Sequence, residues 1–284
     1  MANTSAWTEE DRQLALGEDP AFPACHYRRG CLLGQGGYAR VYKVLDVWKG
    51  TVYAGKSSPD AVKHLRKEAK ILRNLSHPNI VKYIEYYEER DYPSANVLVM
   101  ELCAGGSLQT MINNHTEGLT QKDTLHVLNQ VSQAIEYLHS KKRFHGDLKP
   151  RNILIRKWNP VDVVVADCAE IMHEGKSDDM WAIGISLLGM MSQWPSYYQN
   201  EQRLYPRRCA SHARNLDRLN PGHEIVKLLV LLLEWDHKRR IDASRLVALT
   251  AELLEARIVK PEGTPEPDKM CLEAPKGFQA VEFW

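Results

Sequence analysis

The sequence lacks any long apolar run, which excludes a membrane-spanning helix as an organising feature. Its most apolar stretch, Leu228–Leu233, lies between charged residues and is far too short to cross a bilayer. The N-terminus also lacks the basic-then-apolar pattern of a secretory signal, because the acidic run Glu9–Asp11 stands where the apolar segment would be. We therefore expect a soluble intracellular protein, in the cytoplasm or the nucleus, that uses no membrane.

Cysteine pairs and an excess of one charge are missing as well. The six cysteines include no C-x-x-C pair and no framework spacing, so we expect free thiols in a reducing compartment. The formal net charge of the 284 residues is only +1, and both signs are mixed along the chain, which argues against nucleic acid as the main partner. With 44% hydrophobic residues and no internal repeat, the chain can bury a substantial core in one large domain or two lobes.

The most informative stretch is F-H-G-D-L-K-P-R-N, residues 144–152. It places a carboxylate, an ammonium group and an amide within six positions, at Asp147, Lys149 and Asn152. A carboxylate can orient a hydroxyl group and accept its proton, a lysine can neutralise a phosphoryl group, and an amide oxygen can bind magnesium. The apolar run Ile153–Ile155 follows and predicts a short buried strand that holds the polar loop in place.

A glycine-rich hairpin is predicted near the start of the chain, where residues 31–44 alternate, turn on glycines and alternate again. Glycines allow backbone N–H groups to approach phosphate oxygens without a side chain in the way. A single hairpin of this kind is also compatible with an ordinary tight turn. The following strand ends at Lys56, and a helix is expected to start at Ser57–Pro59, with a hydroxyl cap and a proline in its first turn.

On this helix Glu68 lies beside an apolar stripe, where it could reach Lys56. A lysine held by a glutamate stays extended and can bind phosphates. Further along, Thr120 and Asp123 predict the start of a helix whose apolar side chains recur at helical spacing. The remaining expected elements are strands over 82–88, 96–102 and 161–166, helices from Asp179 and over 225–234 and 243–255, and a proline-containing tail with Phe278, Phe283 and Trp284 able to dock.

Together these stretches resemble the protein kinase family. The loop at residues 145–152 resembles H-R-D-L-K-x-x-N, with Gly146 in place of arginine, and the hairpin resembles G-x-G-x-x-G-x-V, with Ala39 in place of the third glycine. The run from Glu68 to Val81, which contains H-P-N-I-V, resembles the αC–β4 region. The triplet Asp167-Cys168-Ala169 stands where kinases have D-F-G, and residues 179–184 resemble D-x-W-x-x-G.

The resemblance covers roughly residues 27 to 255 and implies an α+β fold of the bilobal protein-kinase type. It divides the chain into an N-terminal extension (1–24), a small β-rich N-lobe with one helix (25–101), a larger helical C-lobe (102–255) and a C-terminal tail (256–284). It also implies ATP and Mg²⁺ as cofactors and a Ser/Thr protein kinase activity toward an unknown protein substrate.

The resemblance further implies a role for each matching residue. The catalytic residues are Asp147, Lys149, Lys56 and Glu68, and the Mg²⁺ ligands are Asn152 and Asp167. The nucleotide would be bound by the glycine loop, by Lys56, by the hinge that follows Met100 in the gatekeeper position, and by apolar residues around the adenine ring. These nucleotide-binding positions are Gly34, Gly36, Gly37, Val41, Ala54, Lys56, Met100, Glu101, Cys103 and Leu154.

The segment after Asp167 departs most from the family. Only 12 positions (179 − 167) separate Asp167 from Asp179, where kinases use about three times as many, and no A-P-E motif is present. Arg240 matches the arginine that pairs with the A-P-E glutamate, so it needs another acid, for which Glu170 and Glu174 are candidates, or an exposed position. Since Gly146 also replaces an arginine, we predict no switching by phosphorylation within residues 168–178.

Two other functions remain open on the sequence. A pseudokinase, which binds nucleotide and acts as an interaction module, is favoured by the short segment and the altered D-F-G triplet. A small-molecule phosphotransferase is favoured by the H-G-D order at residues 145–147, and opposed by H-P-N-I-V and by the motifs around Asp179 and Arg240.

Overall fold

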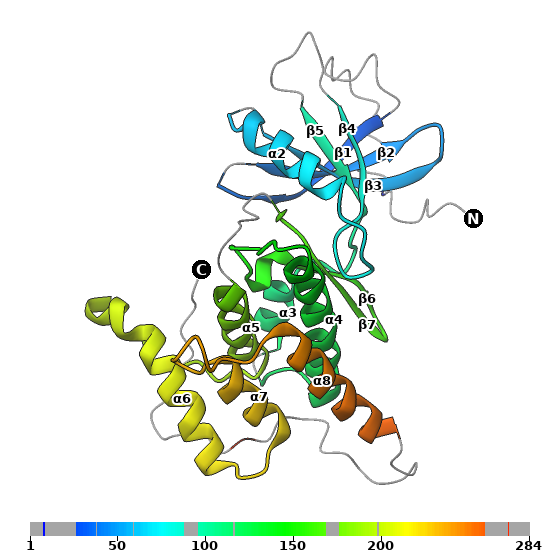
Figure 1. The fold of residues 1–284 in the computed structure, drawn as a ribbon. Helices are drawn as coiled ribbons and strands as arrows, with labels where there is room; N and C mark the ends of the chain where they lie inside the picture. The colour runs from blue at the N-terminus through cyan, green and yellow to red at the C-terminus, as the bar shows by residue number, and fades with distance from the viewer. Residues whose placement is uncertain are drawn as a thin grey trace. The chain divides into compact units, whose positions relative to one another are not determined.

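The computed structural model in Figure 1 describes Thr8, Leu272 and residues 27–37, 39–58, 60–87, 96–115, 117–168, 176–197 and 199–258. The chain forms two compact units. The first comprises Met1–Gly105 together with Ala166–Glu170, and the second comprises Gly106–Val165 together with Ile171–Trp284. Ala166–Glu170 are thus grouped with the first unit, although they follow Gly106–Val165 of the second unit in the chain.

The described residues bear on the expectations for membrane-spanning helices and for the cysteines. Within these ranges no helix is both long and apolar enough to cross a membrane. Cys31, Cys103, Cys168 and Cys209 are free thiols, as predicted. The docking of the aromatic residues in the tail and the state of Cys25 and Cys271 concern residues outside the described ranges.

The first unit contains a five-stranded antiparallel sheet in the order β1-β2-β3-β5-β4. The predicted hairpin is present, and the strands expected over 82–88 and 96–102 are slightly shorter than predicted. The strand bounds are β1 Tyr27–Gln35, β2 Arg40–Asp46, β3 Thr51–Ser57, β4 Tyr83–Tyr87 and β5 Val97–Met100. Strand β3 has buried residues on alternate positions at its start, whereas β5 is apolar and buried at all four positions, as expected for a strand in the middle of the sheet.

One side of this sheet carries a small buried cluster that includes Tyr27, Val44, Val97 and Val99. Gly55 of β3 lies directly against it. A Cβ atom at position 55 would overlap the Val44 side chain and would lie 3.1 Å from Cγ1 of Val97. Glycine is therefore required next to Lys56 because the two valines fill the space that a side chain would need.

Helix α2 (Val62–Leu72) packs against strands β4 and β5 of this sheet (Figure 1). Leu65, Ala69 and Leu72 are buried, as the apolar stripe predicted. The predicted helix start at Ser57–Pro59 is wrong, because α2 begins at Val62 after an Ala61 that makes no side-chain cap. The Ser58 hydroxyl instead accepts a hydrogen bond from the Ala61 amide at 3.0 Å, which forms a turn ahead of the helix.

The second unit is mainly helical, with one two-stranded antiparallel sheet, β6–β7. The strand expected at 153–155 extends to Trp158, and the helix expected from Asp179 begins three residues earlier, at Lys176. The other predicted elements agree within three residues. The bounds are α3 Leu108–Asn114, α4 Gln121–Ser140, η2 Pro150–Asn152, β6 Ile153–Trp158, β7 Val161–Val165, α5 Lys176–Met190, η4 Gln199–Leu204, α6 Tyr205–Leu219, α7 Glu224–Leu232 and α8 Ala243–Ile258.

Helix α4 is the central support of this unit. The Thr120 side chain accepts a hydrogen bond from the Asp123 amide at 3.0 Å, which is the predicted N-terminal cap. The expected apolar positions of α4 are buried, and the helix packs against α8, β7 and α5. The buried positions are Leu125, Leu128, Val131, Ile135 and Leu138. This packing fixes both the end of α4 and the strand β6, which frame the loop at residues 144–152.

Helix α6 was not predicted from the sequence. Its buried side chains are mostly small or polar, namely Cys209, Ala210, His212, Ala213 and Leu216. The usual signal of large apolar residues at helical spacing is therefore weak. Pro206 in its first turn is the clearest indication of where it begins.

The buried His212 on α6 is expected to make the stability of the protein sensitive to acid. Its side chain is almost fully buried, and this burial lowers its pKa to about 4. Below about pH 6.5 the unfolded chain takes up a proton that the folded chain does not, so stability falls as the pH decreases toward 4. We expect this group to contribute a loss of about 3 kcal/mol in the free energy of unfolding.

Urea denaturation at pH 7.5 and at pH 4.5 measures this effect, and the difference in stability between the two pH values should be smaller in a His212→Gln variant by about this amount. His237→Gln, at an exposed position of the same unit, is the matched control and should keep it. Equal pH dependence in the wild type and the His212→Gln variant would contradict the assignment.

Candidate functional site

The glycine-rich turn between β1 and β2 has free space around its glycines. The Gly36 amide donates a hydrogen bond to the Ala39 carbonyl at 2.8 Å, which closes the turn. A Cβ atom at Gly34 or Gly37 would meet no described atom within 4 Å, and at Gly36 only the Ala39 carbonyl at 3.7 Å. The protein's own packing therefore does not require glycine here, and the exposed backbone leaves room for an external group such as a phosphate.

The other predicted nucleotide-binding residues of the first unit lie on neighbouring strands. Val41 of β2 pairs with Lys56, and Ala54 of β3 pairs with Met100 of β5. Beyond β5, Glu101 is held by two hydrogen bonds with Lys82: its amide donates to the Lys82 carbonyl at 3.0 Å, and its side chain accepts from the Lys82 amide at 2.8 Å. Cys103 follows at a half-buried position. In the second unit, Leu154 of β6 forms a bridge with Ser107.

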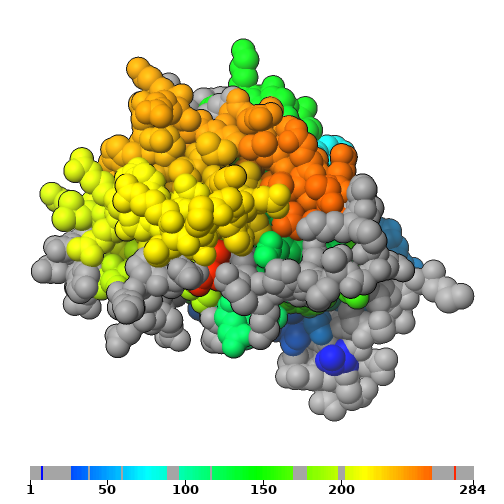
Figure 2. All heavy atoms as spheres, turned by 90° about the horizontal axis from the view of Figure 1, so that it is seen from below, coloured from blue at the N-terminus to red at the C-terminus, as the bar shows by residue number. Residues whose placement is uncertain are grey.

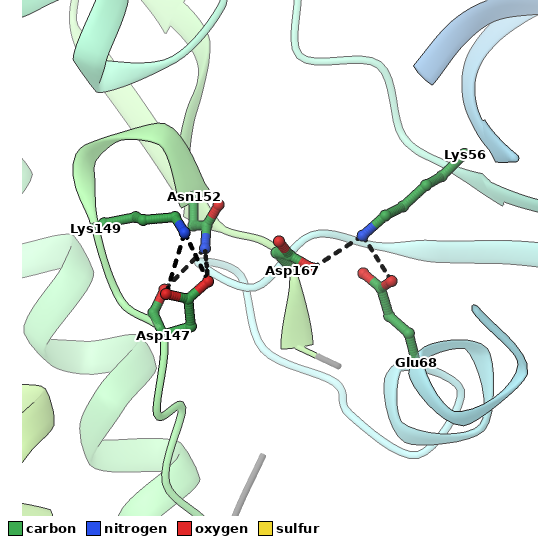
Figure 3. A network of polar contacts seen from close by, with 6 residues as sticks. All are labelled: Lys56, Glu68, Asp147, Lys149, Asn152 and Asp167. Atoms are coloured by element: carbon green, nitrogen blue, oxygen red, sulfur yellow. Dashed lines mark hydrogen bonds and ion pairs between the residues drawn. The ribbon is translucent and has the colours of Figure 1, made fainter. Parts of the chain in front are cut away.

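Lys56 contacts two carboxylates within the first unit (Figure 3). Its ammonium Nζ lies 2.7 Å from Oε2 of Glu68 and 2.9 Å from Oδ1 of Asp167. The predicted contact with Glu68 is thus present. Asp167 reaches the same lysine from a position 111 residues further along the chain, with a positive φ of 62° that non-glycine residues rarely adopt.

Burial and charge act against each other in this group. Burial alone would lower the pKa of Lys56, but the carboxylates of Glu68 and Asp167 outweigh it and raise that pKa, so the lysine is firmly cationic. Burial raises the pKa of Glu68, and Lys56 opposes this effect. Burial therefore sets the direction of the shift in the pKa of Glu68, and the charge of the lysine beside it limits the size of that shift.

Cys168, where kinases have the phenylalanine of D-F-G, is completely buried in the first unit. Burial raises the pKa of its thiol well above the usual range, and the carboxylates of Glu68 and Asp167 add to this effect. The thiol is therefore neutral and acts as a small apolar side chain next to the Lys56 group.

A second polar group lies in the loop of the second unit (Figure 3). The Lys149 ammonium donates to both carboxylate oxygens of Asp147, at 3.1 and 2.8 Å. The Asn152 amide nitrogen donates to the Asp147 carbonyl at 2.8 Å and to its carboxylate at 3.3 Å. The side chains of Asp147 and Lys149 are 42% and 39% exposed, so an external hydroxyl or phosphoryl group could reach them.

The loop at residues 144–152 is held in place by hydrogen bonds to Asp179 of α5, a residue that is 1% exposed. Its carboxylate accepts hydrogen bonds from the amides of His145 and Gly146, at 2.9 and 3.0 Å, and from the ring of His139 at 2.9 Å. Gly146 has a φ of 78°, which glycine adopts at little cost. The sequence reasoning identified Asp179 as part of a motif but missed His139, whose only signal is its place at the end of α4.

Arg240 is partly buried, and its guanidinium contacts a backbone carbonyl and an aromatic ring. Its Nε donates to the Glu234 carbonyl at 3.0 Å, and its guanidinium lies 4.9 Å from the centroid of the Trp181 ring. Burial lowers its pKa, and the charges of Asp178 and Glu234 oppose this. The proposed partners Glu170 and Glu174 lie outside the described residues.

Each of these two groups, taken by itself, offers an oxygen atom that suits a hard cation. The amide nitrogen of Asn152 is engaged by Asp147, which leaves its oxygen to act as a ligand, and one carboxylate oxygen of Asp167 is turned to Lys56. No cluster of three or more His, Cys, Asp or Glu side chains within the described ranges could hold a metal ion by itself. A Mg²⁺ ion would thus depend on few protein ligands together with phosphates and water, as Mg²⁺ commonly does.

Comparison with known proteins identifies the family of this fold. The family model of the protein kinase domain matches residues 27–172, which is 146 of 284 residues and so more than half of the chain. The serine/threonine-protein kinase polo of Drosophila melanogaster is 34% identical over 137 residues, covering 45% of this chain and 23% of that protein. The cell cycle serine/threonine-protein kinase CDC5/MSD2 of Saccharomyces cerevisiae is 26% identical over 239 residues, covering 72% and 33%.

A solved structure shares the fold. The crystal structure of Rad53 1–466 in complex with AMP-PNP superposes with a TM-score of 0.66 at 24% sequence identity, covering 78% of this chain and 64% of that one. The predicted α+β fold of protein-kinase type is thereby confirmed. The curated relatives named above are much longer, since this chain spans only 23% to 33% of their length.

Proposed function

The chain belongs to the protein kinase family, and on this basis we propose that it transfers the γ-phosphoryl group of Mg–ATP to a serine or threonine hydroxyl of a protein. The observation that carries the proposal is that both polar groups are complete: Lys56 with Glu68 and Asp167, and Asp147 with Lys149 and Asn152. The Rad53 structure contains an ATP analogue, which supports a nucleotide as the ligand.

Each residue then has a defined task. Lys56, kept extended and cationic by Glu68, would bind phosphate oxygens, while the open backbone at Gly34, Gly36 and Gly37 would let the phosphates approach closely. Asn152 and Asp167 would hold Mg²⁺, which when bound supplies positive charge to the phosphates. The remaining nucleotide-binding positions would surround the adenine ring.

The loop residues would act on the acceptor. Asp147 would accept a hydrogen bond from the substrate hydroxyl and orient it for attack, and it would take up the proton as the bond to phosphorus forms. Lys149 lies 2.8 Å from Asp147, so its charge would be near both the reacting oxygen and the transferring group. Since this reaction depends mainly on positioning and charge neutralisation, the observed set is chemically sufficient.

A pseudokinase is the second candidate, and one observation favours it. Helix α5 begins at Lys176, so only eight residues, 168–175, separate Asp167 from that helix. In active relatives of the family the corresponding segment is much longer and supports the protein substrate. If the substrate platform is absent, the same residues would bind nucleotide without transferring phosphate.

Changing Asp147 to Asn separates the two candidates. The substitution keeps the shape of the side chain but removes its capacity to take up a proton, so we expect phosphoryl transfer to fall about a hundredfold or more. Binding of Mg–ATP should remain, because Asp147 is not among the proposed nucleotide or metal ligands. The measurements are transfer of ³²P from ATP to casein and histone, and the Mg²⁺-dependent rise in melting temperature with ATP.

Asp60→Asn, which changes an exposed carboxylate of the first unit, is the control and should leave transfer unchanged. Binding of ATP without any transfer by the wild type would select the pseudokinase. Transfer that does not depend on Asp147 would remove the proposed role of the loop.

A further inference from the structure

Aromatic and cationic side chains from helix α6, from the turn after α7 and from α5 contact one another in a row. The guanidinium of Arg207 lies 5.2 Å from the centroid of the Trp235 ring, and Trp235 meets Trp181 in a T-shaped contact at 6.1 Å. Trp235 is 48% exposed, although a tryptophan ring favours burial. We call Arg207, Trp235 and the exposed arginines of α6 the Arg–Trp surface.

The arginines follow one side of α6. Arg207, Arg214 and Arg218 are exposed and separated by seven and four residues, which places them along the same side of an α-helix, over about 16 Å. In Figure 2 the yellow atoms of α6 form part of the outer surface of this unit. Within the described ranges none of these three arginines forms an ion pair, and the one acidic residue of α6 is Asp217.

Exposed apolar side chains occur at both ends of the same helix. Leu204, just before α6, is 48% exposed, and Leu219, its last residue, is 41% exposed. Tryptophan and arginine are the residues most often found to dominate the binding energy of protein interfaces, particularly where apolar neighbours exclude water. The combination therefore differs from a helix side that carries only solvated charges.

From these features we propose that the Arg–Trp surface is a docking site for an acidic segment of another protein. Guanidinium groups bind carboxylates through paired, charge-assisted hydrogen bonds, so glutamates or aspartates would be complementary to the three arginines. A stripe of this length matches about five residues of an extended peptide. Leu204, which lies three residues before Arg207, would contact an apolar side chain of the peptide, and the backbone of a nucleic acid has no such group. The proposal goes beyond phosphoryl transfer and does not depend on it.

Fluorescence anisotropy with the full chain tests the proposal. The probe is a fluorescein-labelled peptide of twelve residues that contains four glutamates and two leucines, and the comparison probe has glutamine in place of each glutamate. We expect the glutamate peptide to bind and the glutamine peptide to bind at least about tenfold more weakly. The double variant Arg207→Glu/Arg214→Glu should lose about tenfold or more in affinity, and Trp235→Ala should lose severalfold.

Arg245→Glu, at an exposed position at the start of α8, is the matched control and should bind like the wild type. Melting temperatures show whether each variant folds. If the double variant does not fold, the single variant Arg218→Glu takes its place. The proposal is wrong if the glutamate peptide does not bind, if both peptides bind equally, or if Arg245→Glu weakens binding as much as the double variant. Tighter binding of a single-stranded oligonucleotide through the same arginines would also overturn it.

Discussion

Replacing Lys56 with methionine is expected to reduce phosphoryl transfer about a thousandfold, because it removes the charge proposed to bind the phosphates. Methionine has a similar length and no charge, so the local packing changes little. Steady-state kinetics with ATP measures the loss. The control is Lys63→Met, which removes an exposed lysine from α2 and should leave the rate unchanged. A Lys56→Met variant with near-normal transfer would contradict the assigned role.

The same variant should show a stronger dependence of stability on pH than the wild type, in which burial already raises the pKa of Glu68. Without Lys56, burial and the charge of Asp167 would raise the pKa of Glu68 further above its ordinary value of 4.5. The folded protein would then hold a proton that the unfolded chain releases, so the stability of the variant should decrease as the pH rises above about 4.5. Urea denaturation between pH 5 and 8 measures this slope. If the role of Lys56 were only local packing, the slope of the variant would equal that of the wild type.

Replacing Asp179 with asparagine is expected to lower both stability and transfer. Its carboxylate accepts three hydrogen bonds at a position that is 1% exposed, and an amide nitrogen would face backbone N–H groups that can only donate. We expect the free energy of unfolding to fall by about 3 kcal/mol, because buried donors lose their acceptor. Transfer should also fall, because the loop that carries Asp147 loses its anchor.

Chemical denaturation and transfer assays on the folded fraction separate these two effects. The neighbouring Asp178→Asn is the control, since Asp178 is exposed and should tolerate the change. A stable Asp179→Asn variant with full transfer would show that the loop holds its conformation without this carboxylate.

The parts of the fold that could be predicted are those set by local patterns. The strands of the first unit and helix α4 follow from alternation, helical spacing and the Thr120 cap, all of which act over a few residues. The start of α2 could not be placed from the sequence. The Ser58 hydroxyl accepts a hydrogen bond from the Ala61 amide in a turn that precedes the helix, and it does not cap the helix itself. Helix α6 gave no signal because its buried side is made of small and polar residues.

The candidate site could be predicted where residues act within one motif, and less well where distant residues meet. Asp147, Lys149 and Asn152 lie within six consecutive positions, so a local pattern is enough to find this cluster. The contact of Lys56 with Asp167 joins residues 111 positions apart, and no pattern in the sequence predicts it. His139, which contacts Asp179 across 40 positions, has no sequence pattern that marks it. Such contacts depend on tertiary packing, which periodicity does not encode.

The glycine beside Lys56 has a consequence for how this sequence can vary. Val44 and Val97 fill the space over Gly55, so a larger residue at position 55 fits only if one of these valines becomes smaller. The three positions, which lie on three adjacent strands, should therefore covary among close homologues of this chain. A library that randomises them together should yield folded proteins far more often than one that randomises position 55 alone.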